Sequence, residues 1–93
     1  MEGTQFFEVS IVDQVRGQCF SDTVTQCTLP AVNGSISVYP NHADLTTLLR
    51  EGPISITLSN SELRSFVLNG SGIAGISKGK LKILTNSVVD DNR

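Results

Sequence analysis

Apolar and polar residues alternate with a period of two in several short segments of this chain. The alternation runs through residues 7–11, 36–38, 54–58 and 80–83. This period is typical of strands that turn one face to a core and the other to water. Short strands at intervals of about ten residues, separated by Gly, Asn, Ser and Pro, are typical of a sandwich or barrel. We therefore predict an all-β, two-sheet antiparallel β-sandwich.

The length and composition indicate one ordinary globular domain. The chain has 93 residues, of which 39% are hydrophobic and 17% charged. We predict a single domain over 1–93, with an ordered core at 6–89 and a frayed polar tail at 90–93. The net charge of -2 is too small to indicate nucleic-acid binding. The longest uncharged apolar stretch, 66–76, is too short to cross a bilayer, and the N-terminus lacks the pattern of a signal peptide.

Two hairpins and one ambiguous segment complete the local prediction. Residues 59–62 join the strand at 54–58 to one at 63–68, and residues 77–80 join a strand ending at Ile76 to the one at 81–84. Gly79 is expected to take a positive φ in the second turn. Residues 45–49 fit helical spacing and a strand about equally, so the residue pattern leaves both open there.

A glycine motif at 70–75, GSGIAG, matches the G-x-G-x-x-G pattern of dinucleotide-binding folds. That function needs a helix after the glycines, and here turn residues and a strand follow. We therefore interpret the glycines as positions of close backbone packing between strands. The carboxylates are scattered and His42 is the only histidine. The sequence predicts no catalytic residues, no metal site and no cofactor.

Cys19 and Cys27 could form a disulfide, bind a metal or fill apolar space. A metal site would need more ligands than the chain offers, and two cysteines without a signal peptide are more often free thiols. We predict that both are reduced and buried.

The segment at 33–43, NGSISVYPNHA, places a glycine-led loop before an alternating strand and a Tyr-Pro-x-His-Ala turn. In this it resembles the epsilon subunit of F-type ATP synthases. The resemblance continues through Leu45, Thr47 and Gly52 and covers residues 7–89, with one extra residue before Gly72. It implies the same β-sandwich, and it implies an extended strand at 45–49.

The resemblance implies two contact surfaces. Contact with the gamma subunit is expected at Tyr39, His42, Ala43 and Leu45. Contact with the polar loops of the c-ring is expected at Val32, Asn33, Gly34 and Ser35. Two positions depart from the family pattern, because many relatives have Glu at the position of Ser35 and Pro or another uncharged residue at that of Asp44. An ordinary solvated loop is the alternative for 32–35, and a loop histidine bonded to nearby backbone is the alternative for His42.

The function implied is that of a non-catalytic rotor subunit, which links gamma to the c-ring and supports coupling of proton flow to ATP synthesis. Such a subunit is peripheral to the cytoplasmic face of a bacterial inner membrane, or to the equivalent face of an organelle, and does not insert into the bilayer. Longer members continue into two C-terminal helices that regulate ATP hydrolysis, and this sequence ends at Arg93, before such a pair. The alternative function is a free-standing β-sandwich that binds a peptide or sugar.

Overall fold

The computed structural model describes residues 6–91 and contains nine strands within them. In chain order they are β1 (Phe7–Asp13), β2 (Gly17–Ala31), β3 (Gly34–Val38), β4 (Leu45–Leu49), β5 (Gly52–Leu58), β6 (Leu63–Leu68), β7 (Gly72–Ser77), β8 (Lys80–Thr85) and β9 (Val88–Asp90). No helix occurs in this part of the chain. No helix that could span a membrane occurs there either.

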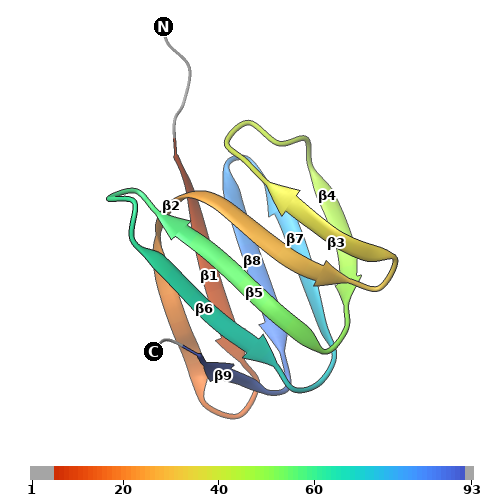
Figure 1. Cartoon of the computed structure of the whole chain (residues 1–93). Helices are drawn as coiled ribbons and strands as arrows, with labels where there is room; N and C mark the ends of the chain where they lie inside the picture. Colours follow the sequence, from red (N-terminus) through yellow and green to blue (C-terminus); the bar gives the residue numbers. More distant parts are fainter. Residues whose placement is uncertain (1–5, 92–93) are drawn as a thin grey trace, which may run out of the picture.

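The strands form two layers that share one strand (Figure 1). One layer runs in the order β1-β8-β7-β4, and the other contains β3, β2, β5, β6 and β9. Buried apolar side chains from both layers form one core cluster, whose fully buried members include Ile11, Leu29, Ile54 and Ile83. The predicted all-β sandwich is confirmed. Its pairs are antiparallel as expected except β1 with β8, which is parallel.

The longest strand, β2, was not recognised from the sequence. Two irregularities hide its alternation. Cys19 is an extra residue opposite β1, and Thr25 is an extra residue opposite β5. Each β-bulge shifts the phase of the side chains by one residue and bends the strand. As a result β2 pairs with β1 through its first half and lies between β3 and β5 through its second half.

The predicted hairpins are confirmed, and β4 resolves the ambiguous segment as a strand. Lys78 and Gly79 both have positive φ, 53° and 76°, as a tight two-residue turn requires. In the other turn, Ser61 has a φ of 74° and the Leu58 N–H donates to the Glu62 carbonyl at 2.8 Å.

The glycine motif lies on the strand β7 and the turn before it, and the interpretation as close packing holds for Gly70 and Gly72 but is wrong for Gly75, around which a β-carbon would meet nothing within 4 Å. A β-carbon on Gly72 would lie 2.8 Å from the Leu84 carbonyl oxygen. One on Gly70 would lie 2.3 Å from the Asn86 Oδ1. The first contact is with the backbone of the neighbouring strand, so β8 approaches too closely for a side chain at position 72, while the second is with the end of a side chain that would have to turn away.

The expectation of a frayed tail is wrong for Asp90 and Asp91. Asp90 ends β9, opposite Phe66, and the Asp91 N–H donates to the Ser65 carbonyl at 2.8 Å. The Asp90 carboxylate also accepts from the Arg64 Nη2 at 3.1 Å. The rest of the tail, 92–93, lies outside the described residues.

The prediction that both cysteines are buried is wrong for Cys19. Cys27 lies in the core, while Cys19 is exposed in the first bulge of β2. Both are free thiols. Burial raises the pKa of the Cys27 thiol to about 12, because the thiolate would lose its hydration.

A thiol reagent at pH 8 should therefore modify one cysteine of the native protein quickly and the other only on unfolding. The reactive species is the thiolate, which burial disfavours at Cys27, while the exposed Cys19 is within reach of the reagent. Intact mass against time measures the labelling. The Cys19→Ser variant should lose the fast phase, and a fast phase that survives in it would contradict the assignment.

Candidate interaction surfaces

The turn between β3 and β4, at 39–44, is exposed and held by its own hydrogen bonds. The Tyr39 side chain is 53% exposed, and its hydroxyl accepts from the Gln26 Nε2 at 3.3 Å. The His42 N–H donates to the Tyr39 carbonyl at 3.2 Å, and Asn41 between them has a φ of 68°. These bonds fix the shape of the turn without burying its side chains.

The His42 ring bonds to adjacent backbone. Its Nδ1 lies 2.7 Å from the Ala43 carbonyl oxygen, which can only accept, so Nδ1 is the donor. In the neutral ring this leaves Nε2 as an acceptor. The whole side chain is exposed. The expected bonding of a loop histidine is therefore present, and it leaves one ring nitrogen available to a partner.

The loop at 32–35 forms the tip of the β2–β3 hairpin, and all four of its residues are exposed. Gly34 has a φ of 127°, which favours glycine at this point of the tip. The Val32 N–H donates to the Leu48 carbonyl at 3.0 Å, and this bond ties the tip to β4. The tip is thus an anchored projection of the sandwich.

The two segments that the sequence singled out lie at opposite ends of β3 (Figure 1). Residues 36–38 of the extended strand lie between them and keep Ser35 roughly 13 Å from Tyr39. The structure does not bring the two together into one site, so they are two surfaces of one rigid body.

A row of exposed apolar side chains crosses the outer face of the β1-β8-β7-β4 layer. Leu48 pairs with Ile73, and Ile73 pairs with Leu84, in register across three strands. These side chains are 58%, 38% and 40% exposed, respectively. We call Leu48, Ile73 and Leu84 the apolar row. Contiguous exposed apolar surface on a small domain is a mark of an interaction site.

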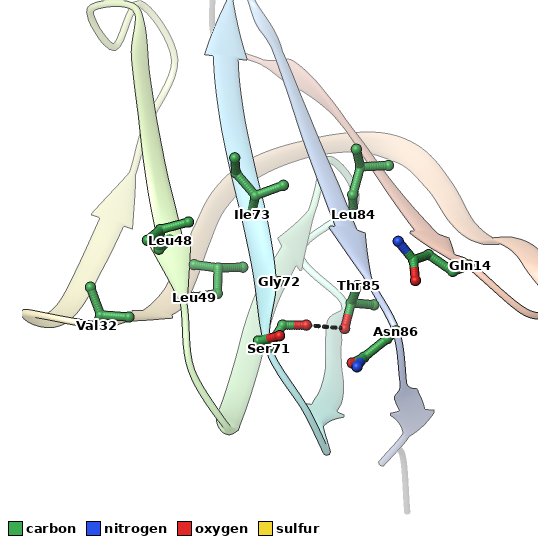
Figure 2. A pocket seen from close by; sticks show the side chains of 10 residues that line it. All are labelled: Gln14, Val32, Leu48, Leu49, Ser71, Gly72, Ile73, Leu84, Thr85 and Asn86. Atoms are coloured by element: carbon green, nitrogen blue, oxygen red, sulfur yellow. Dashed lines mark hydrogen bonds between the residues drawn. The ribbon is translucent and has the colours of Figure 1, made fainter.

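The apolar row continues into a shallow depression of about 520 Å³ toward one end of the sandwich (Figure 2). Val32 extends its apolar wall, and Gln14, Ser71 and Asn86 add polar groups. The depression therefore reaches from the sheet face to the tip of the β2–β3 hairpin.

The apolar row was missed by sequence reasoning, although the sequence carries a signal for it. Each member stands next to a buried or packed neighbour, at a position that alternation assigns to solvent. Leu48 precedes the buried Leu49, and Leu84 follows the buried Ile83. Apolar residues at the solvent-facing positions of several neighbouring strands are the pattern that could have identified this face.

Two polar side chains are buried within the described residues, Asp13 and Thr85, and they are register partners. The Asp13 carboxylate accepts from the Val15 N–H at 2.8 Å, the Arg16 N–H at 3.2 Å and the Val88 N–H at 3.3 Å. It also pairs with the Arg16 Nη2, which donates to the Val88 carbonyl. These hydrogen bonds, of which the one from the Val15 N–H has the largest effect, lower the pKa of Asp13 below its ordinary value. Burial acts in the opposite direction but is outweighed.

This lowered pKa gives a testable pH dependence. A carboxyl with a lower pKa in the folded state stabilises the fold above its unfolded pKa of about 3.9, and the contribution is lost as the pH falls through the folded pKa. The Asp13→Asn variant should be less stable than the parent at pH 7, and the difference should shrink below about pH 4. Urea unfolding at several pH values measures it. Asp44→Asn, at an exposed turn, is the control and should unfold at the same urea concentration as the parent at pH 7.

The described residues contain no group of three or more His, Cys, Asp or Glu side chains that could hold a metal ion. The surfaces above are made of apolar side chains, loop backbone and polar groups, with one exposed carboxylate at Asp44. Such surfaces bind other macromolecules by complementarity.

The fold and these surfaces define a small β-sandwich with an exposed apolar row on one sheet face and an exposed loop tip at one end. Residues 6–91 match the family model of the ATP synthase delta/epsilon chain β-sandwich domain, and the chain belongs to this family. An ATP synthase epsilon chain of Campylobacter curvus is 40% identical over 74 residues, which are 80% of this chain and 57% of that one. An ATP synthase epsilon chain 2 of Nitrobacter hamburgensis is 36% identical over 81 residues, covering 87% and 57% of the two chains.

Solved structures show the same fold. A chain of the Euglena gracilis mitochondrial ATP synthase, in an OSCP/F1/c-ring assembly, superposes with a TM-score of 0.85 at 16% identity over 97% of this chain and 56% of that one. A chain of the Tetrahymena thermophila mitochondrial ATP synthase central stalk and c-ring has a TM-score of 0.73 at 13% identity, over 97% and 69%. This chain thus spans a little over half the length of the curated relatives named above.

Proposed function

We propose that this chain is a non-catalytic rotor subunit of a proton-translocating F-type ATP synthase, in which it links the gamma subunit to the c-ring. Family membership supports the proposal, and so do the epsilon-chain names of the relatives. The observation that carries it is the placing of an apolar sheet face and an anchored loop tip on one rigid sandwich. A subunit that transmits torque needs two such surfaces in a fixed relation, and it needs no reaction centre.

The gamma-facing surface would consist of the turn residues Tyr39, His42, Ala43 and Leu45 together with the apolar row. The strand β4 joins the two parts, because it begins at Leu45 and carries Leu48. Apolar anchors at the centre of an interface supply most of its binding free energy, while polar groups such as the His42 ring lie at the rim. The apolar row is the more exposed and contiguous part, so we assign it the central role.

The c-ring-facing surface would be the tip of the β2–β3 hairpin, Val32, Asn33, Gly34 and Ser35. These residues offer exposed backbone, one apolar and two uncharged polar side chains. Polar loops of a membrane subunit fit such a tip through hydrogen bonds and shape. In this arrangement the chain lies at the cytoplasmic face of a bacterial inner membrane, or the equivalent organelle face, without entering the bilayer.

The test adds the purified chain to membranes whose ATP synthase lacks epsilon. ATP-driven proton pumping should recover relative to ATP hydrolysis, because the chain completes the link between gamma and the c-ring. Cysteine at Ser35 should crosslink to a cysteine in the polar loop of a c subunit, and cysteine at His42 to gamma. A chain that does not bind these membranes, or that crosslinks only to stator subunits, would refute the proposal.

A further inference from the structure

The buried pair Asp13 and Thr85 ties together three turns at one end of the sandwich. Asp13 holds the β1–β2 turn through the Val15 and Arg16 N–H groups, and it holds the start of β9 through Val88. These are bonds between segments up to 75 residues apart.

Thr85 completes the set. Its hydroxyl donates to the Ser71 carbonyl at 3.0 Å, in the turn before β7 (Figure 2). The same hydroxyl accepts from the Ser87 N–H at 3.2 Å, in the turn before β9. The Thr85 carbonyl accepts from the Gln14 N–H at 2.9 Å. The turns β1–β2, β6–β7 and β8–β9 are thus fixed to one residue pair.

This pair is connected to the hairpin tip by a series of residues that are paired across neighbouring strands. Successive register partners lead from Asp13 through Thr85, Gly72, Leu49 and Ala31 to Gly34. The series contains a close backbone contact at Gly72 and the buried side chains of Leu49 and Ala31. The three turns and the tip are therefore attached to one continuous series of paired residues.

The exposed residues of these turns surround the same depression. Gln14, Ser71 and Asn86 line it together with Val32 of the tip. Four segments far apart in sequence thus form one rim, in which Gln14, Ser71 and Asn86 are the polar members and Val32 is the apolar one (Figure 2).

We propose that the rim of Gln14, Ser71 and Asn86 contacts the same partner as the tip at 32–35, and that Asp13 and Thr85 are the positioning residues that hold this rim rigid. The inference rests on the proposed function, under which the partner is the polar loop of a c subunit. The uncharged amide and hydroxyl groups of the rim suit hydrogen bonding to such a loop, and prior ordering lowers the entropy cost of the contact. Under this proposal the tip at 32–35 is one edge of a broader binding surface for the c subunit.

Crosslinking tests the contact in epsilon-depleted membranes, with Cys19→Ser as the background to remove the exposed thiol. Cysteine at Ser71 should crosslink to the c-loop cysteine, as cysteine at Ser35 does. If Ser35→Cys and His42→Cys crosslink as proposed and Ser71→Cys does not, the rim makes no contact and this inference is wrong while the proposed function stands. If Ser35→Cys also fails with the c loop, the proposed c-ring docking fails with it.

Amide hydrogen exchange tests the positioning role. Thr85→Val keeps the shape and removes the hydroxyl, so the Ser87 and Asn69 amides should exchange about tenfold faster, as expected for local opening after loss of a buried hydrogen bond. The core amides of β2 and β5 should be unchanged, and Ser71–c crosslinking should fall while His42–gamma crosslinking holds. Thr85→Ser keeps the hydroxyl and should restore the exchange rates of the parent. Thr28→Val removes an exposed hydroxyl that pairs with Ser37, and it should leave the exchange of the Ser87 and Asn69 amides unchanged.

Uniform acceleration of all amides in Thr85→Val would show that the residue serves global stability alone, and it would overturn the positioning role. Unchanged exchange at Ser87 and Asn69 would overturn it as well. Should Thr85→Val fail to fold, Asp13→Asn provides the second variant, with Asp90→Asn as its control at the far end of β9.

Discussion

Replacing Ile73 with Glu should reduce binding of the chain to the gamma subunit by at least about 30-fold, which corresponds to about 2 kcal/mol at a central interface position. Ile73 is the middle member of the apolar row, between Leu48 and Leu84, so a carboxylate there would be buried by the partner without a counterpart. The isolated chain should fold normally, because the position is 38% exposed. Titration calorimetry with purified gamma measures the affinity.

Leu63→Glu is the matched control. Leu63 is 76% exposed on β6, in the other layer, and lies outside both proposed surfaces. It should bind gamma as the parent does. Equal affinity for the parent and Ile73→Glu would remove the apolar row from the gamma interface and leave only the turn at 39–45.

Gly72→Ala should cost about 2 kcal/mol of folding free energy, a drop of about 10 °C in Tm for a domain of this size. The new β-carbon would meet the Leu84 carbonyl oxygen at 2.8 Å, and both belong to paired strands that cannot move apart without breaking the ladder. Urea and thermal unfolding give the values.

Gly75→Ala, three residues further along β7, is the control, because a β-carbon there meets nothing within 4 Å. Its expected effect is neutral or a gain of up to about 0.5–1 kcal/mol, since alanine restricts the unfolded chain. A similar loss at both positions would mean that close packing at Gly72 is not the cause.

The sequence was sufficient for strands whose alternation is unbroken. Residues 7–11 and 80–83 follow the period of two, and both proved to be strands with their apolar side buried. It was insufficient for β2, because the extra residues Cys19 and Thr25 reset the phase twice and a pattern search sees no regular period. The exposure of Cys19 follows from the same cause.

The candidate surfaces were predictable only in part. The turn at 39–45 and the tip at 32–35 stood out through a family motif that is local in sequence. The apolar row joins residues of three strands whose neighbourhood depends on long-range pairing, so single-segment reasoning sees only isolated apolar residues. The same holds for Asp13, whose partner Val88 comes from the last strand. A carboxylate after an apolar strand gives no local sign that it will be buried.

The sharing of β2 between the two layers has a mechanical consequence. Two separate sheets that meet through apolar side chains can slide past each other at the cost of repacking those side chains. In this sandwich a shearing load on the β1-β8-β7-β4 layer reaches the opposite layer along the covalent backbone of β2. The pairing of Ala31 in β2 with Leu49 in β4 joins the two layers at their other edge. The force is therefore transmitted through backbone connections on both sides of the core. The body should therefore rotate as one piece under a tangential force, with its compliance confined to the projecting turns.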